Sequence, residues 1–147
     1  VDDQVFVWKG LRIMGLGGSI RYNSEETFQY TEREMRRRMR RLWFKAHRAG
    51  GIDLLLTHSP AAGLNDSTDH AHKGFACFND LLEEYQPKWF VHGHVHLSYN
   101  ANLPRVCTHG QTTVINATER YTFEIPDPDP VARKRFFWND PAFPTKN

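Results

Sequence analysis

Apolar and polar positions along this chain repeat with two periods, that of a β-strand and that of an α-helix, and the two alternate along the sequence. Short apolar runs at residues 5–7, 11–14, 52–56 and 88–91 predict β-strands. The run at 52–56 is almost continuously apolar, as expected for a strand that is buried on both faces. Residues 15–19 read Gly-Leu-Gly-Gly-Ser and end the second run; Ile20 stands where a dinucleotide-binding loop needs a third small residue.

The most regular stretch predicts a helix that begins near Thr31. Thr31 and Glu34 have the spacing of a capping box, and Gly50 follows the last periodic position. The expected buried stripe of this helix consists of Met35, Met39, Leu42, Trp43 and Ala46.

A second amphipathic helix and a group of strands are expected further along. The helix is predicted from the spacing of its apolar residues, which are Phe75, Phe78, Leu82 and Tyr85, and Pro87 ends it. Successive short antiparallel strands are expected at residues 105–108, 112–116 and 121–125. Strand–helix–strand alternation followed by hairpins favours an α/β fold in which a mixed sheet is layered with helices. Residues 1–125 are expected to form one domain, and residues 126–147 an irregular Pro-rich tail.

Composition by itself indicates neither a nucleic-acid-binding, a membrane nor a disulfide-rich protein. The 147 residues carry a net charge of only +2, so no global field attracts nucleic acid or membrane, and no partner of either kind is required. No apolar run approaches the roughly 18–20 residues of a transmembrane helix. Two cysteines cannot form a disulfide framework, which favours a reduced, cytoplasmic location.

Positive charge is concentrated in the first predicted helix. Residues 31–48 contain eight basic and two acidic side chains. One interpretation is an anion-binding face. We prefer the other, a solvated helix surface, because the charged side of an amphipathic helix usually faces water.

Histidines stand out, because seven of the eight fall between His58 and His109. His58 follows the predicted strand 52–56, and His94 and His96 follow the strand 88–91 within Gly93-His94-Val95-His96. Open α/β sheets hold their ligand sites where strands end, so these three imidazoles are expected to converge on a transition metal. Gly93 is expected to let the backbone bend there.

The remaining histidines have ordinary interpretations. His47 and His109 are taken as surface or core residues, and His92 as structural, because it should face away from Val91 in an extended strand. A Gly-His-x-His match arises by chance in about 3% of chains of this composition and length, so the motif is suggestive by itself.

The combined features resemble the calcineurin-like metallophosphoesterases. The matching residues are Thr57-His58-Ser59-Pro60 after a buried strand, Gly93-His94-Val95-His96 after the next, and the strand that begins at Thr112. The resemblance covers about residues 5–125. It implies a layered sandwich of mixed sheet and helices, and hydrolysis of a phosphomonoester or phosphodiester by a hydroxide that two metal ions activate.

The resemblance also implies a ligand set. His58 and His94 would bind one divalent transition metal and His96 the other, and imidazole suits Mn, Fe, Ni or Zn equally. Asp69 and His72 are candidates for the substrate pocket, as is Asp66, although solvated loop positions are the preferred interpretation of all three.

The sequence departs from the family in lacking its earlier motifs, Asp-x-His, Gly-Asp-x-x-Asp and Gly-Asn-His-Asp/Glu. Those motifs supply the other ligands and a catalytic histidine, so the catalytic residues are expected upstream of Val1. We therefore expect this chain to be the C-terminal part of a longer enzyme and to be inactive alone. The alternative function is a non-catalytic module that binds a single zinc ion or an anion.

Overall fold

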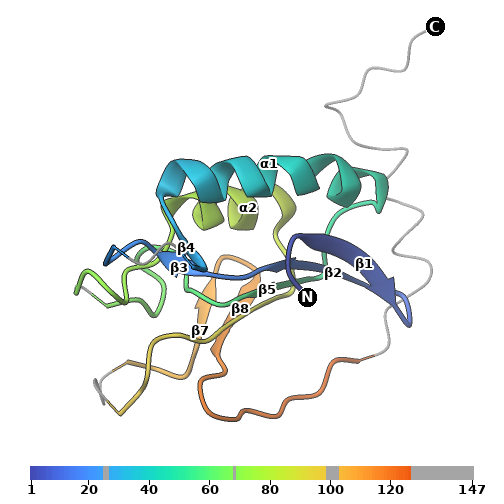
Figure 1. Ribbon diagram of the computed structural model, residues 1–147. Helices are drawn as coiled ribbons and strands as arrows, with labels where there is room; N and C mark the ends of the chain where they lie inside the picture. The colour runs from blue at the N-terminus through green and yellow to red at the C-terminus, as the bar shows by residue number, and fades with distance from the viewer. Residues whose placement is uncertain (25–26, 68, 99–102, 127–147) are drawn as a thin grey trace, which may run out of the picture.

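The computed structural model describes residues 1–24, 27–67, 69–98 and 103–126, and shows a mixed sheet with two helices on one face (Figure 1). The strands of the main sheet are β1 (Gln4–Trp8), β2 (Leu11–Leu16), β5 (Leu54–Thr57), β6 (Trp89–His92), β7 (Val106–His109) and β8 (Thr112–Asn116). A small separate sheet contains β3 (Ser19–Ile20) and β4 (Gln29–Tyr30), which the sequence did not predict. The expected α/β class is confirmed.

The order of strands in the main sheet is β1-β2-β5-β6-β8-β7. The four inner strands, β2, β5, β6 and β8, are parallel to one another, and the edge strands β1 and β7 are antiparallel to their neighbours. The expectation of successive antiparallel strands after Pro104 is therefore only partly correct. β7 and β8 form the expected hairpin, but β8 is inserted between β7 and β6, so that it pairs with β6 in parallel.

Helix α1 (Glu32–Arg48) begins as predicted. The Thr31 hydroxyl accepts a hydrogen bond from the Glu34 amide at 3.3 Å, and the Glu34 carboxylate accepts one from the Thr31 amide at 2.7 Å. This reciprocal pair satisfies two of the amide donors that every helix start leaves unpaired.

The buried stripe of α1 differs from the prediction at one position. Met35, Met39, Leu42 and Ala46 are buried, but 41% of Trp43 is exposed, and its indole N–H donates to Glu84 instead. Trp43 lies on the edge of the stripe, beside α2, where a large ring can be half covered while its polar atom stays accessible.

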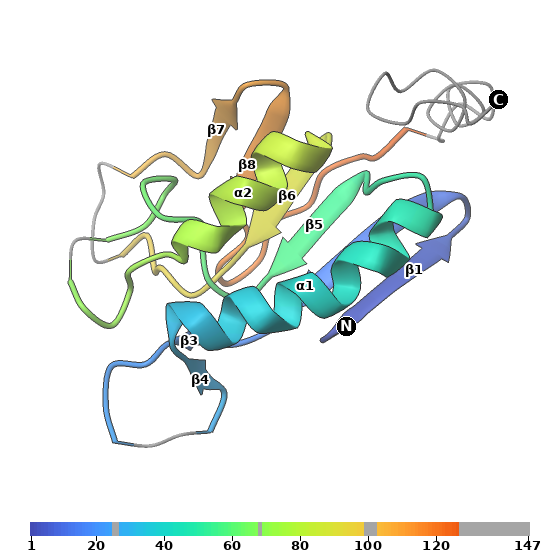
Figure 2. The ribbon, with the colours of Figure 1, turned by 90° about the horizontal axis from the view of Figure 1, so that it is seen from above.

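Helix α2 (Ala76–Tyr85) lies beside α1 on the same face of the sheet, as the view from above shows (Figure 2). Phe75 precedes it and cannot cap it, since it has no polar side chain. The carboxylate of Glu32 on α1 supplies the cap by accepting hydrogen bonds from the amides of Ala76 (3.1 Å) and Cys77 (2.6 Å). A negative charge at a helix start is also favourable for the helix dipole. The start of each helix is thus fixed to the other.

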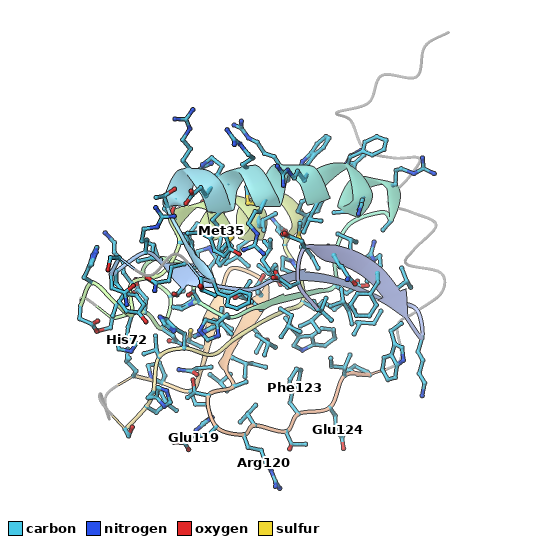
Figure 3. All side chains as sticks on the ribbon, in the orientation of Figure 1. Met35, His72, Glu119, Arg120, Phe123 and Glu124 are labelled. Carbon is cyan, nitrogen blue, oxygen red and sulfur yellow. The ribbon has the colours of Figure 1, made fainter. Side chains whose placement is uncertain are left out.

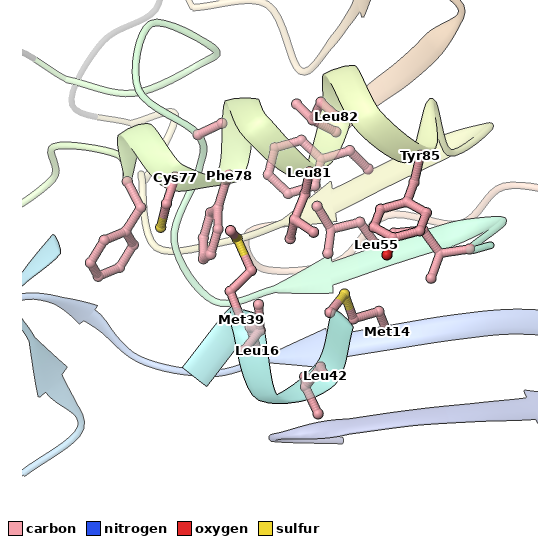
Figure 4. Packing of buried hydrophobic residues seen from close by; sticks show 14 of the residues in the cluster. Met14, Leu16, Met39, Leu42, Leu55, Cys77, Phe78, Leu81, Leu82 and Tyr85 are labelled. Atoms are coloured by element: carbon pink, nitrogen blue, oxygen red, sulfur yellow. The ribbon is translucent and has the colours of Figure 1, made fainter. Parts of the chain in front are cut away.

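The main hydrophobic core lies between the sheet and the two helices (Figure 4). Its fully buried side chains include Met14, Leu55, Phe78, Leu81 and Phe90. No helix in the described part of the chain is long and apolar enough to cross a membrane.

A second, smaller cluster covers the opposite face of the sheet. Leu54, Val91 and Ile115 are buried there, and Phe123 and Ile125 pack against them. The prediction of a strand at 121–125 is wrong, because this segment has no ladder partner. Residues 121–125 cover this face of the sheet by side-chain packing, without pairing to a strand. Alternating apolar residues serve such a covering segment as well as a β-strand, which is why the pattern predicted a strand. Except for Pro126, the predicted tail at 126–147 lies outside the described residues.

One arginine of the basic stretch is part of the interior. Only 8% of the Arg38 side chain is exposed; its guanidinium forms ion pairs with Asp2 (2.5 Å) and Asp3 (3.0 Å) and donates to the Gly17 carbonyl at 2.6 Å. The same group lies 4.2 Å from the centre of the Tyr30 ring. Arg38 therefore joins the N-terminal residues, the exit of β2 and β4 to α1.

We predict that Arg38→Ala lowers the free energy of unfolding by about 2–3 kcal/mol, because several charge-assisted hydrogen bonds to a buried side chain are lost together. Arg37→Ala, at the neighbouring exposed position, is the matched control and should change it by less than about 0.5 kcal/mol. Urea denaturation of the two variants measures the difference. Equal effects of the two substitutions would contradict a structural role for Arg38.

Candidate metal-binding edge of the sheet

The candidate site lies where the four parallel strands end. β2 ends at Leu16, β5 at Thr57, β6 at His92 and β8 at Asn116, and all four point in the same direction. Backbone hydrogen bonds extend the sheet into the loops beyond these ends: the His58 amide donates to Leu16 at 3.2 Å, and the Gly93 amide donates to His58 at 3.0 Å. The loops after β5 and β6 are thereby held side by side.

His58 and His94 meet across these two loops. Nε2 of His58 lies 3.0 Å from Nδ1 of His94, and the ring centres are 4.7 Å apart. Partial burial lowers the pKa of both imidazoles, which favours their neutral, metal-binding form. His58 and His94, which the resemblance assigns to one metal, are therefore neighbours in space.

The other nitrogen of His94 is also engaged. Nε2 lies 2.8 Å from the carbonyl oxygen of Ala71. Because a carbonyl only accepts, Nε2 carries the proton and Nδ1 presents its lone pair toward His58. Metal-binding histidines commonly donate their second N–H to such an acceptor, which fixes the tautomer and the ring orientation.

The turn that carries His94 has an unusual backbone. His94 has a φ of 68°, in the left-handed region that a residue with a side chain seldom occupies, and the Val95 amide donates to the Gly93 carbonyl at 2.8 Å. The sequence placed the bend at Gly93, but the positive φ falls on His94 instead. A Cβ built at Gly93 would also meet no atom closer than 3.8 Å.

Two buried polar residues, one at the end of β8 and one two positions beyond it, hold this turn. The side-chain amide of Asn116 donates to the Val95 carbonyl at 2.8 Å, and the Thr118 hydroxyl lies 3.0 Å from the same oxygen. Asn116 Oδ1 in turn accepts from the Thr118 amide at 3.0 Å. Sequence reasoning missed both roles. The available signal was a polar side chain directly after the apolar pair Val114 and Ile115.

His72 extends the histidine cluster. Its ring centre lies 5.1 Å from that of His94, and its Nδ1 lies 2.9 Å and 3.0 Å from the two carboxylate oxygens of Asp69. Hydrogen bonds from Ser67 and then from His72 lower the pKa of Asp69 below its usual range. The amides of Ala71 and His72 both donate to the Asp69 carboxylate at 3.0 Å, so the loop is internally ordered.

The remaining predicted residues have other surroundings. The His96 side chain is exposed, two residues beyond His94. Asp66 accepts from the Gly74 amide at 3.2 Å and so anchors the loop. His92 is buried against Phe90, with ring centres 5.4 Å apart, and burial lowers its pKa to about 4. These contacts agree with a structural interpretation of His92.

The donor set fits part of one metal site. Two nitrogen ligands at about 2.0–2.1 Å from a tetrahedral ion lie about 3.3 Å apart, close to the 3.0 Å between His58 and His94. No group of three or more His, Cys, Asp or Glu side chains that could hold a metal ion forms within residues 1–24, 27–67, 69–98 and 103–126. This edge of the sheet therefore offers two imidazole ligands and lacks a complete ligand set among those residues.

Comparison with known proteins gives structural matches only. No protein-family model matches this chain, and no curated protein does. One solved crystal structure is similar with a TM-score of 0.56 and 21% sequence identity, over 80% of this chain and 44% of that one. The crystal structure of TT1561 of Thermus thermophilus gives a TM-score of 0.49 and 14% identity, over 79% of this chain and 48% of that one. The first match shows a shared fold, and this chain spans less than half the length of either protein.

We predict that Asn116→Ala lowers the free energy of unfolding by about 1–3 kcal/mol, because the buried Val95 carbonyl and Thr118 amide each lose a partner. Amide exchange of Val95 should accelerate as the turn loosens. Thr113→Ala, on the same strand, is the control and should cost about 0.5 kcal/mol without affecting the turn. Unchanged exchange at Val95 in Asn116→Ala would show that the turn does not depend on β8.

Proposed function

We propose that this chain forms part of a metal-dependent phosphoesterase of the calcineurin-like type, which hydrolyses a phosphomonoester or phosphodiester. The observation that carries the proposal is the 3.0 Å contact between His58 and His94 at the carboxyl edge of a parallel sheet. The layered metallophosphoesterase sandwich is part of the same proposal, and the mixed sheet with helices on one face is compatible with it.

In this proposal His58 and His94 bind one metal ion and His96 binds the other. The Ala71 carbonyl holds the His94 proton on Nε2, so that Nδ1 is available as a ligand. Asn116 holds the His94 turn in its strained conformation. The turn is therefore already ordered before a metal ion binds, and binding does not have to supply that free energy. Two bound divalent ions would supply charge to clamp the phosphate and lower the pKa of a water molecule toward neutrality.

In the proposed site, the Asp69–His72 pair would lie beside the metal ligand His94. Asp69 holds the Nδ1 side of the His72 ring, which leaves Nε2 directed away from the carboxylate. An oriented imidazole near the metal ligands can hydrogen-bond a phosphate oxygen of the substrate. Asp69 is exposed, so it orients His72 at the surface of the chain.

The ligand set of a two-metal centre includes carboxylates that neutralise its charge. Among the described residues, no carboxylate joins His58 and His94 in a group that could hold a metal ion. The proposal therefore assigns this chain only part of the active site. The upstream coding sequence should specify Asp-x-His and Gly-Asn-His motifs, and the protein that contains them is the one to assay.

We predict that the full-length protein contains about two divalent transition metal ions per chain and hydrolyses bis-aryl phosphates. His94→Ala should lower the activity about 100-fold or more and reduce the bound metal, because a ligand is lost. His109→Ala, outside the site, is the matched control and should retain both. Elemental analysis and a colorimetric assay give the two readouts.

Other outcomes would contradict the proposal in different ways. One metal ion per chain without turnover would favour the single-zinc module. The isolated 147 residues should show no appreciable turnover. Metal-dependent hydrolysis by these residues alone, abolished by His94→Ala, would show that the site is complete without upstream ligands.

A further inference from the structure

The outward surface of α1 carries a dense set of cations that the fold does not use. Of the eight basic residues between 31 and 48, Arg36 pairs with Asp80 and Glu32, and Arg38 is buried with Asp2 and Asp3. The other six are exposed, and no ion pair in the described part of the chain includes them. We call these six the basic face of α1; they are Arg33, Arg37, Arg40, Arg41, Lys45 and Arg48.

The basic face points away from the sheet. The buried stripe of α1 occupies the opposite side of the helix, and nitrogen-tipped side chains and aromatic rings rise from the helix on the side away from the core (Figure 3). At 1.5 Å per residue, the fifteen steps from Arg33 to Arg48 span about 22 Å. Cations repeated at this spacing form a linear track for an anionic chain.

An exposed aromatic ring lies within this track. Phe44 is 61% exposed, and positions three and four residues from it on the helix are occupied by Arg40, Arg41 and Arg48. The Arg48 guanidinium lies 5.9 Å from the centre of the Phe44 ring. An exposed ring among cations offers a flat surface on which a nucleobase can stack.

Acidic side chains on α2, beside the basic face, favour a narrow partner over a flat one. α2 lies on the same face of the sheet and exposes Asp80, Glu83 and Glu84. A flat anionic membrane pressed against α1 would also approach these carboxylates. A narrow polyanion that follows the α1 axis avoids them, so charge complementarity favours a single strand over a bilayer.

We propose that the basic face of α1 binds single-stranded nucleic acid, with its arginines and Lys45 on the phosphates and a base stacked on Phe44. Aromatic stacking distinguishes this partner from an acidic peptide, which offers charge without flat bases. The proposal is independent of the phosphoesterase activity, because none of these residues belongs to the His58–His94 edge.

The test is fluorescence anisotropy of labelled oligo-dT of about 20 nucleotides with the 147-residue chain between about 50 and 300 mM NaCl. Arg37→Glu/Arg41→Glu should weaken binding about tenfold or more and reduce the slope of log affinity against log salt by about 1.4, since each lost phosphate contact contributes about 0.7. Phe44→Ala should weaken binding about fivefold or more.

Matched controls test whether a loss of affinity comes from the basic face itself, from the change in net charge, or from the loss of any exposed aromatic ring. Lys9→Glu/Arg120→Glu makes the same change in charge elsewhere on the surface, and Tyr22→Ala removes another exposed ring. Each should change the affinity less than about twofold. Circular dichroism confirms that every variant is folded, as expected for exposed positions.

Several results would overturn the proposal. These are no binding below about 100 μM at about 50 mM NaCl, equal losses in the control variants, or displacement of oligo-dT by polyglutamate as effective as by unlabelled oligo-dT. Binding to vesicles with about 30% phosphatidylserine that is tighter than binding to oligo-dT, and that is lost in Arg37→Glu/Arg41→Glu, would also overturn the proposal. The partner of the basic face would then be a membrane surface and not nucleic acid.

Discussion

Parallel pairing of β2, β5, β6 and β8 is the constraint on which the candidate site depends. Because all four strands run in one direction, the loops that follow them emerge at one edge, and backbone hydrogen bonds from His58 to Leu16 and from Gly93 to His58 continue the ladder beyond the strands. Two imidazoles that are 36 positions apart in the chain are thereby brought to 3.0 Å. Side chains on freely moving loops would lose conformational entropy to reach this arrangement.

The energy of this edge is a balance between local strain and buried hydrogen bonds. The left-handed conformation of His94 costs about 1–3 kcal/mol, and hydrogen bonds to the Val95 carbonyl and from the Gly93 amide each offset about 1 kcal/mol. Asn116 is fully buried and supplies one of these bonds from a third strand. The His94 turn is therefore stable only within the assembled sheet, where a residue from a distant part of the chain completes it.

Helix α1 shows how one stretch of sequence serves three purposes. Its apolar stripe builds the core, Glu32 and Arg38 tie it to the start of α2 and to the N-terminal residues, and its outer side carries cations around Phe44. Periodicity alone assigned Trp43 to the core and treated all the arginines alike. Burial of Arg38 and exposure of Trp43 follow from what packs against each side of the helix, which no pattern within the helix encodes.

The sequence by itself determined the local elements, because capping and periodicity are short-range properties: the Thr31–Glu34 box, both helices, the apolar inner strands and the position of histidines after two of them. It also singled out His58 and His94. Only the tertiary structure decided the long-range features. These are the insertion of β8 between β6 and β7, the packing of Phe123 and Ile125 against the sheet without strand pairing, and the support of the His94 turn by Asn116. These features depend on contacts between distant segments, whose free energy arises only when the chain is folded.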